Sequence, residues 1–238
     1  MRVASLPLVL QTVLLSIVLP VVGHSADMGK TAFHRHRHHA HSAETGETAF
    51  HRNGLQAKIH FCTECHGPSA RGFRGYYPIP QLAGQQVQYL ENQFKALAEH
   101  RRDNPVAKRF MVPVVQSIDP AMRTAIAEHF SALKPRPAGG GPKNLVEQGK
   151  KIFAEGVPDE NIPACSACHG EDGKGSDMVP RIAGQMYAYT VAQLSGWGKG
   201  YRAKDPVSAE DANTMQPIAS SMTKEQISAV AAYVSRLD

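Results

Sequence analysis

The sequence predicts an all-α protein that consists of two tandem helical domains. Apolar residues recur at helical spacing in the segments that flank two cysteine motifs, and no segment shows the convincing alternation of a strand. The motifs, CTECH at 62–66 and CSACH at 165–169, share one pattern. A chain of 238 residues with 42% hydrophobic content can bury one or two modest cores. We therefore expect one domain around each motif.

The first 26 residues are predicted to form an export signal. Arg2 precedes an apolar stretch at 6–22, and the small residues Gly23, Ser25 and Ala26 follow. The stretch is short for a spanning helix and is interrupted by prolines and a glutamine, so a cleaved signal is favoured over a retained anchor. Because no second apolar run of spanning length follows, we expect a soluble, periplasmic mature protein.

Residues 27–49 are predicted to form a disordered arm. The arm contains HRHRHHAH at 34–41, within a short local duplication. Clustered imidazoles suit copper, zinc or nickel, so a metal-binding tract is one interpretation. We favour a solvated low-complexity arm, because no cysteine or carboxylate cluster completes a defined metal site.

All four cysteines lie in the two CxxCH motifs, which argues against most uses of a cysteine pair. Two disulfides would be the ordinary expectation for an exported protein. The motifs are about a hundred residues apart, too far for a zinc ribbon, and no stretch supplies four closely spaced thiolates for an iron–sulfur cluster. A thioredoxin-type pair would follow a strand, and no β-branched run precedes either motif.

Covalent haem attachment accounts for every residue of the motifs. Two thiols three residues apart can bond the two vinyl groups of one porphyrin, and the histidine that follows can bind its iron. The sequence therefore predicts two haem c groups. The predicted attachment residues are Cys62, Cys65, Cys165 and Cys168, and the predicted proximal iron ligands are His66 and His169.

The repeat extends well beyond the cysteines. PQLAGQQVQYLENQF begins at Pro80 and PRIAGQMYAYTVAQL begins at Pro180, an offset of 100 residues that also aligns Arg102 with Arg202. Those two arginines can reach haem propionates or form surface ion pairs. Pro80 follows the second cysteine of its motif by fifteen residues, whereas Pro180 follows its own by twelve. The string GFRGYY is therefore expected to enlarge a surface loop in the first copy.

A methionine at matching positions is the predicted sixth iron ligand in each copy. Met111 follows His66 by 45 residues and Met215 follows His169 by 46, and each has a proline two residues later. The neutral, soft thioether suits the iron of an electron carrier. Core packing is the alternative for any single methionine. Four other methionines, at 122, 178, 186 and 222, lack such a match.

A helix is predicted to close each domain. TKEQISAVAAYVSRL begins with the capping-box pair Thr223 and Gln226. In the first copy Asp119 can cap a helix that starts with Pro120. Both segments carry apolar residues on one face, so both are expected to pack on a core.

A helix is also predicted to open each domain, more clearly in the second copy. In NLVEQGKKIFAEG, Gly149 and Phe153 are placed to pack against the closing helix near Tyr233. The corresponding first-copy string, NGLQAKIHF, is shorter. The predicted domains are a first copy at 50–134 and a second copy at 145–238. Residues 135–144 form a linker with a stiff, proline-rich start and a flexible, glycine-rich middle.

The doubled CxxCH motif with LAGQ and IAGQ strings resembles the dihaem cytochrome c4 family, which has tandem class I cytochrome c domains, each built around one covalently attached haem. The resemblance covers roughly residues 50–238. It implies that the carbonyl groups of Pro80 and Pro180 accept hydrogen bonds from the proximal histidines. It also implies that the two domains meet across a polar interface with their haems close enough to exchange electrons.

If a histidine binds one side of each iron and a methionine binds the other, no position is open for a substrate. We therefore expect an electron carrier and not an enzyme. The resemblance implies transfer from a quinol-oxidising complex to a terminal oxidase or reductase. An electron-transfer subunit of a separately encoded dehydrogenase is the alternative, and a dihaem peroxidase is a weaker one. We expect redox-protein partners, with peripheral contact to membrane complexes, and no small-molecule substrate. Nucleic acid is not expected, because four haem propionates would largely balance the net charge of +5.

Overall fold

The computed structural model describes residues 46–202 and 214–238. The predicted export signal and the histidine-rich tract at 34–41 lie outside the described residues. Within them the chain forms helices, three isolated β-bridges and no strands, which confirms the predicted all-α class. No helix in the described ranges combines the length and the apolar character needed to cross a membrane.

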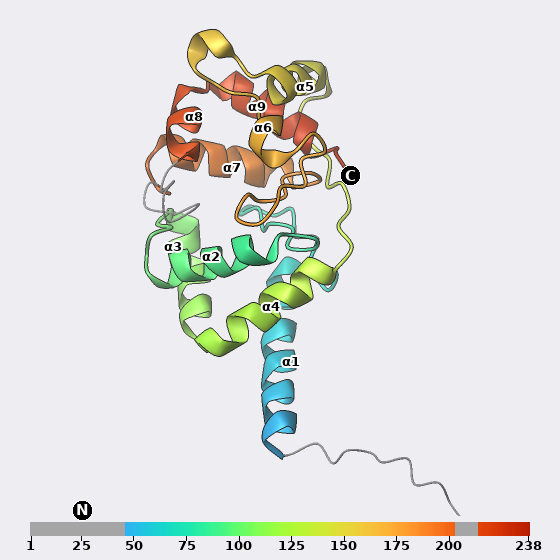
Figure 1. The fold of residues 1–238 in the computed structure, drawn as a ribbon, viewed down its shortest axis with the longest axis vertical. Helices are drawn as coiled ribbons and strands as arrows, with labels where there is room; N and C mark the ends of the chain where they lie inside the picture. The colour runs from blue at the N-terminus through green and yellow to red at the C-terminus, as the bar shows by residue number, and fades with distance from the viewer. Residues whose placement is uncertain (1–45, 203–213) are drawn as a thin grey trace, which may run out of the picture. The chain divides into compact units, whose positions relative to one another are not determined.

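Four helices make up the first copy (Figure 1). They are α1 (Gly46–His66), α2 (Val87–Ala98), α3 (Pro105–Gln116) and α4 (Pro120–Ala132). Helix α1 is 21 residues long, so it begins four residues before the predicted domain boundary and carries the whole CxxCH motif on its last turns. One hydrophobic cluster, which includes Phe94, Val115, Ile126 and Phe130, joins these helices.

Five α-helices make up the described part of the second copy (Figure 1). They are α5 (Val146–Glu155), α6 (Ser166–His169), α7 (Tyr187–Gly198), α8 (Met215–Ser221) and α9 (Lys224–Val234), with short 3-10 turns at Lys143–Leu145 and Pro158–Glu160. One apolar cluster forms between α5 and α9, and a second between α7, α8 and the start of α9. Helix α9 therefore borders both clusters.

Side-chain caps start both closing helices, as the sequence predicts. Thr223 Oγ1 accepts from the backbone N–H of Gln226 at 3.2 Å, and the Gln226 side chain accepts from the N–H of Thr223 at 2.7 Å. In the first copy the Asp119 carboxylate accepts from the N–H of Ala121 at 3.0 Å. Each bond satisfies a backbone donor that the helix itself cannot pair.

A glycine allows the opening and closing helices of the second copy to approach closely, which confirms the predicted contact. A Cβ atom at Gly149 would lie 2.0 Å from the backbone oxygen of Ala229 and 2.9 Å from Cβ of Tyr233. One turn later the rings of Phe153 and Tyr233 pack with their centroids 5.3 Å apart. Helices α5 and α9 are therefore in backbone contact at this crossing.

The linker is fixed by hydrogen bonds to both copies, although its glycines suggested flexibility. The N–H of Arg136 donates to Gln81 Oε1 at 3.2 Å, and the N–H of Gly139 donates to the carbonyl of Ser235 at 2.7 Å. Gly139 to Gly141 all have positive φ, between 62° and 112°. Glycine is needed here because other residues rarely adopt that backbone conformation.

Substitution of Gly149 by alanine should strongly destabilise the second copy. The new methyl group meets backbone atoms, which cannot move aside as a side chain can, so we expect a loss of about 2–3 kcal/mol in the free energy of unfolding. Denaturant unfolding followed by helical circular dichroism measures it. Gly196→Ala is the matched control, because its Cβ would find its nearest neighbour at 3.9 Å. Equal stability of the two variants would contradict the close crossing.

Candidate haem-binding sites

Each predicted proximal histidine ends a helix and faces the loop that follows. His66 is the last residue of α1 and His169 is the last residue of α6, and both are buried. Nδ1 of His66 lies 2.9 Å from the carbonyl oxygen of Pro80, and Nδ1 of His169 lies 2.9 Å from that of Pro180. A carbonyl can only accept, so Nδ1 carries the proton in both rings. The other nitrogen, Nε2, is left to bind a metal.

Burial keeps both imidazoles neutral. It lowers the pKa of His66 and of His169, although the bond to the proline carbonyl acts in the opposite direction. A neutral imidazole whose protonated nitrogen is already fixed has the form that binds iron. The two histidines therefore share the same tautomer, the same hydrogen bond and the same direction of pKa shift.

The four cysteines are all free thiols. Cys62 and Cys165 are half-buried, and Cys65 and Cys168 are exposed. Burial raises the pKa of Cys62, and it raises that of Cys165 to about 11. A thioredoxin-type redox pair requires a lowered thiol pKa. Cys62 and Cys165 thus lack the property that such a pair needs. Each motif offers two thiols for thioether bonds to a porphyrin.

The predicted methionine ligands lie at the edges of the apolar clusters. Met111 is in the middle of α3 and packs half-buried on the same cluster as Cys62. Met215 is the first residue of α8 and packs half-buried on the cluster of α7 and α8. Cys165 borders the other second-copy cluster, and α9 contributes to both. The methionines remain predictions as iron ligands.

Reciprocal hydrogen bonds join the histidine-binding loops of the two copies. The side-chain amide of Gln85 pairs with the backbone of Arg181, and the amide of Gln185 pairs with the backbone of Gln81. The four N···O distances are 2.8, 2.9, 3.0 and 3.0 Å. All four residues are buried. We call this set of bonds the glutamine clasp.

A second polar cluster lies between the copies. Arg102 and Arg202 each donate to Oε1 of both Gln93 and Gln193, at 2.8–3.2 Å. Arg102 also donates to the Tyr189 hydroxyl at 2.8 Å. The interpretation of the arginines as surface ion pairs is wrong, because they are only 9% and 2% exposed. Their use toward haem propionates stays a prediction.

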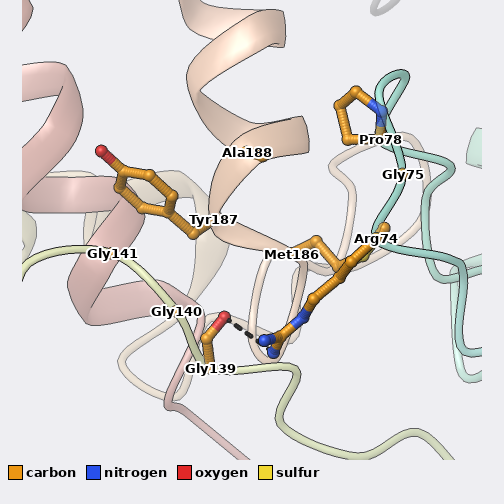
Figure 2. A pocket seen from close by; sticks show the side chains of 9 residues that line it. All are labelled: Arg74, Gly75, Pro78, Gly139, Gly140, Gly141, Met186, Tyr187 and Ala188. Carbon is orange, nitrogen blue, oxygen red and sulfur yellow. Dashed lines mark hydrogen bonds between the residues drawn. The ribbon is translucent and has the colours of Figure 1, made fainter.

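A cavity of about 230 Å³ lies beside the linker (Figure 2). The enlarged first-copy loop, the three linker glycines and the start of α7 line it, and Arg74 donates to the carbonyl of Gly139 at 3.3 Å. None of the predicted haem residues belongs to its lining. It is also smaller than a typical cofactor pocket, so it is a separate feature.

Comparison with known proteins decides the family. Residues 146–238 match the family model of cytochrome c. The chain is 42% identical over 178 residues to cytochrome c-552 of Acidithiobacillus ferridurans, which is 74% of this chain and 73% of the relative. The solved cytochrome c4 of Acidithiobacillus ferrooxidans matches with a TM-score of 0.64 and 41% identity, over 74% of this chain and 98% of that one. The chain belongs to the cytochrome c4 family.

A further relative of this cytochrome c4 is named for its partner enzyme. It is the thiosulfate dehydrogenase electron acceptor of Thiomonas intermedia, 34% identical over 179 residues, or 73% of this chain and 77% of the relative. These relationships confirm the predicted fold of tandem class I cytochrome c domains. They also establish haem c as the cofactor type and electron transfer as the activity.

The residues present fit haem c. Each motif provides two unpaired thiols and a buried imidazole whose Nδ1 is already bonded, which is the donor set that a covalently attached haem requires. The predicted proline contacts are therefore in place in this cytochrome c4. The glutamine clasp was not predicted, although Gln85 and Gln185 occupy the same position in both copies, as do Gln93 and Gln193.

Replacing Gln85 with leucine should destabilise the contact between the copies. The substitution leaves the buried N–H and C=O of Arg181 without partners, at about 1–3 kcal/mol for each group. Denaturant unfolding of the haem-loaded protein measures the loss, with exposed Gln88→Leu in the same segment as control. An unchanged midpoint for Gln85→Leu would contradict the clasp.

Proposed function

We propose that this cytochrome c4 is a dihaem periplasmic electron carrier with one haem c in each copy. Cys62 and Cys65 bond the first haem, and Cys165 and Cys168 bond the second. The observation that carries the proposal is the pair of matching histidine sites, each with Nδ1 held 2.9 Å from a proline carbonyl. His66 with Met111 would hold the first iron, and His169 with Met215 would hold the second.

The chain's own residues hold the iron sites closed. When bound, the haem supplies a reversible one-electron change between ferrous and ferric iron. The proline carbonyl fixes the imidazole ring and its tautomer, and each proposed methionine ligand packs against an apolar cluster. A histidine and a methionine on each iron would leave no site for a substrate, so the protein would carry electrons without being an enzyme.

The proposed flow of electrons runs from a quinol-oxidising complex to a terminal oxidase or reductase. A role as the acceptor of a separately encoded dehydrogenase is a second candidate, favoured by the relative named as a thiosulfate dehydrogenase electron acceptor. In both cases the partners are redox proteins. The proposed location is the periplasm, which follows from the predicted export signal at 1–26.

The exposed apolar residues gather on the first copy. Of the seven large apolar side chains that are exposed in the described residues, six belong to this copy and only Tyr201 belongs to the other. Three of them form an aromatic patch, which we define as Tyr76, Tyr77 and Phe110. The Tyr77 ring lies 5.4 Å from that of Phe110, and Tyr76 is 93% exposed. The patch consists of residues from the loop before Pro80 and of Phe110, which directly precedes Met111.

The charge around the patch favours an acidic partner. Residues 50–134 contain eleven Lys and Arg against six Asp and Glu, a net charge of +5, whereas residues 145–238 contain nine against twelve, a net charge of −3. Exposed Arg74 and Arg109 border the patch, and Arg109 Cζ lies 5.2 Å from the Phe110 ring centroid. The shorter second-copy loop instead carries Asp177. We infer that the first copy docks an acidic redox protein.

Removing the proposed sixth ligand should open one haem to carbon monoxide. In Met111→Ala or Met215→Ala, carbon monoxide should change the visible spectrum of one reduced haem, because ferrous iron binds it at a free axial position. Met178→Ala, in the loop before Pro180, is the control and should leave the spectrum unchanged. If either ligand variant behaves like the control, that methionine does not bind iron.

Reversing charge at the aromatic patch should slow electron transfer from an acidic donor. The probe is reduced plant-type ferredoxin, a small acidic protein, mixed with the ferric protein by stopped flow at low salt. We expect about threefold to tenfold slower reduction for Arg109→Glu and a smaller loss for Tyr76→Ser. Lys150→Glu, exposed on α5, changes the net charge equally and should have no effect. An equal loss for Lys150→Glu would show that net charge alone sets the rate.

A further inference from the structure

The histidine of the first copy is connected to a glutamine of the second copy through one peptide group. The carbonyl oxygen of this peptide, from Pro80, lies 2.9 Å from His66 Nδ1. The N–H of the same peptide belongs to Gln81 and donates to Gln185 Oε1 at 3.0 Å. One continuous chain of hydrogen bonds therefore runs from the second copy to the first proximal histidine.

The same chain runs in the opposite direction. The peptide between Pro180 and Arg181 accepts from His169 Nδ1 at 2.9 Å and donates to Gln85 Oε1 at 2.8 Å. The prolines, the residues that follow them and the glutamines each differ by 100 residues between the copies, and the histidines differ by 103, so the two chains are counterparts. Each histidine is thus bonded to a proline carbonyl of its own copy and is connected through that peptide to a glutamine of the other copy.

The orientation of each glutamine amide is fixed by the backbone that it contacts. Gln185 Nε2 donates to the carbonyl of Gln81 at 3.0 Å, and Gln85 Nε2 donates to that of Arg181 at 2.9 Å. If the side-chain amide were turned over, its oxygen would face the backbone carbonyl oxygen and its NH2 group would face the backbone N–H. The amide oxygen must therefore point to the N–H of the histidine-binding peptide. Gly84 and Gly184, at φ of 69° and 71°, allow the turn that precedes each glutamine.

The connection has an electronic consequence. A peptide whose N–H donates to a good acceptor becomes more polarised, so its carbonyl oxygen is a stronger acceptor in turn. A stronger bond from the histidine Nδ1–H makes the imidazole more electron-rich and favours ferric iron. Gln81, Gln85, Arg181 and Gln185 are all less than 9% exposed, so little water screens the chain.

We propose that Gln85 and Gln185 are positioning residues that lower the reduction potential of the haem in the opposite copy. The proposal rests on the proposed function, because it needs one haem beside each histidine. It makes the clasp an electronic connection as well as a structural one. Gln185 tunes the first site, and Gln85 tunes the second.

The test is a redox titration that resolves the two haems by NMR of the intact haem-loaded protein. Gln185→Met removes the acceptor at similar size. It should favour the ferrous state of the first haem by about two- to fivefold, or about 20–40 mV at 59 mV per tenfold change, with a smaller change at the second. Gln85→Met should produce the reverse pattern. The Nδ1–H signal of the opposite histidine should move in each variant, since its hydrogen bond weakens.

Gln193→Met is the matched control, because Gln193 lies between the copies and contacts no histidine-binding peptide. Equal shifts at both haems, or the same shifts in the control, would mean that a loosened contact is responsible and would overturn the proposal. A shift confined to the copy that carries the substitution would overturn it as well. A protein without two haems would instead contradict the proposed function.

Discussion

The glutamine clasp is the interaction on which the arrangement of the two candidate haem sites depends. It bonds the N–H and the C=O of one residue in each copy, and that residue directly follows the proline that fixes the histidine. Removing either amide would leave two buried backbone groups without partners. The position of each histidine-binding loop is therefore set by both copies together.

Several other features help to bring the histidine-binding loops of the two copies together. Positive φ at Gly84 and Gly184 turns the chain so that the next residue, a glutamine, can reach across. The backbone N–H of the linker residue Arg136 donates to the side chain of Gln81, whose backbone belongs to the clasp. The linker is thus attached to a residue of the clasp. Arg102 and Arg202 add a second set of shared bonds through Gln93 and Gln193. The interior between the copies is thus nearly symmetric, while the surface is not: the basic, aromatic loop of the first copy has a shorter, acidic counterpart in the second.

Much of the fold and of each site could be predicted from the sequence, because local signals carry it. The CxxCH motifs, the caps at Asp119 and Thr223 and the close approach at Gly149 each depend on a few neighbouring residues or on one helix crossing. The early start of α1 at Gly46 could not be seen, because residues 46–49 read as the end of the low-complexity arm. The role of Gln85 and Gln185 was also missed. A glutamine in a loop reads as a surface residue, and its burial arises only when two distant segments pack. The identical position in both copies was the available signal.

The central claim is that each copy holds one haem that is closed on both sides. The most direct measurement is a spectroscopic redox titration of the intact exported protein, performed with and without carbon monoxide, together with a haem count. The account predicts two covalently bound haems that both titrate at high potential and a reduced spectrum that carbon monoxide leaves unchanged. A single haem, or a reduced haem that binds carbon monoxide, would contradict it.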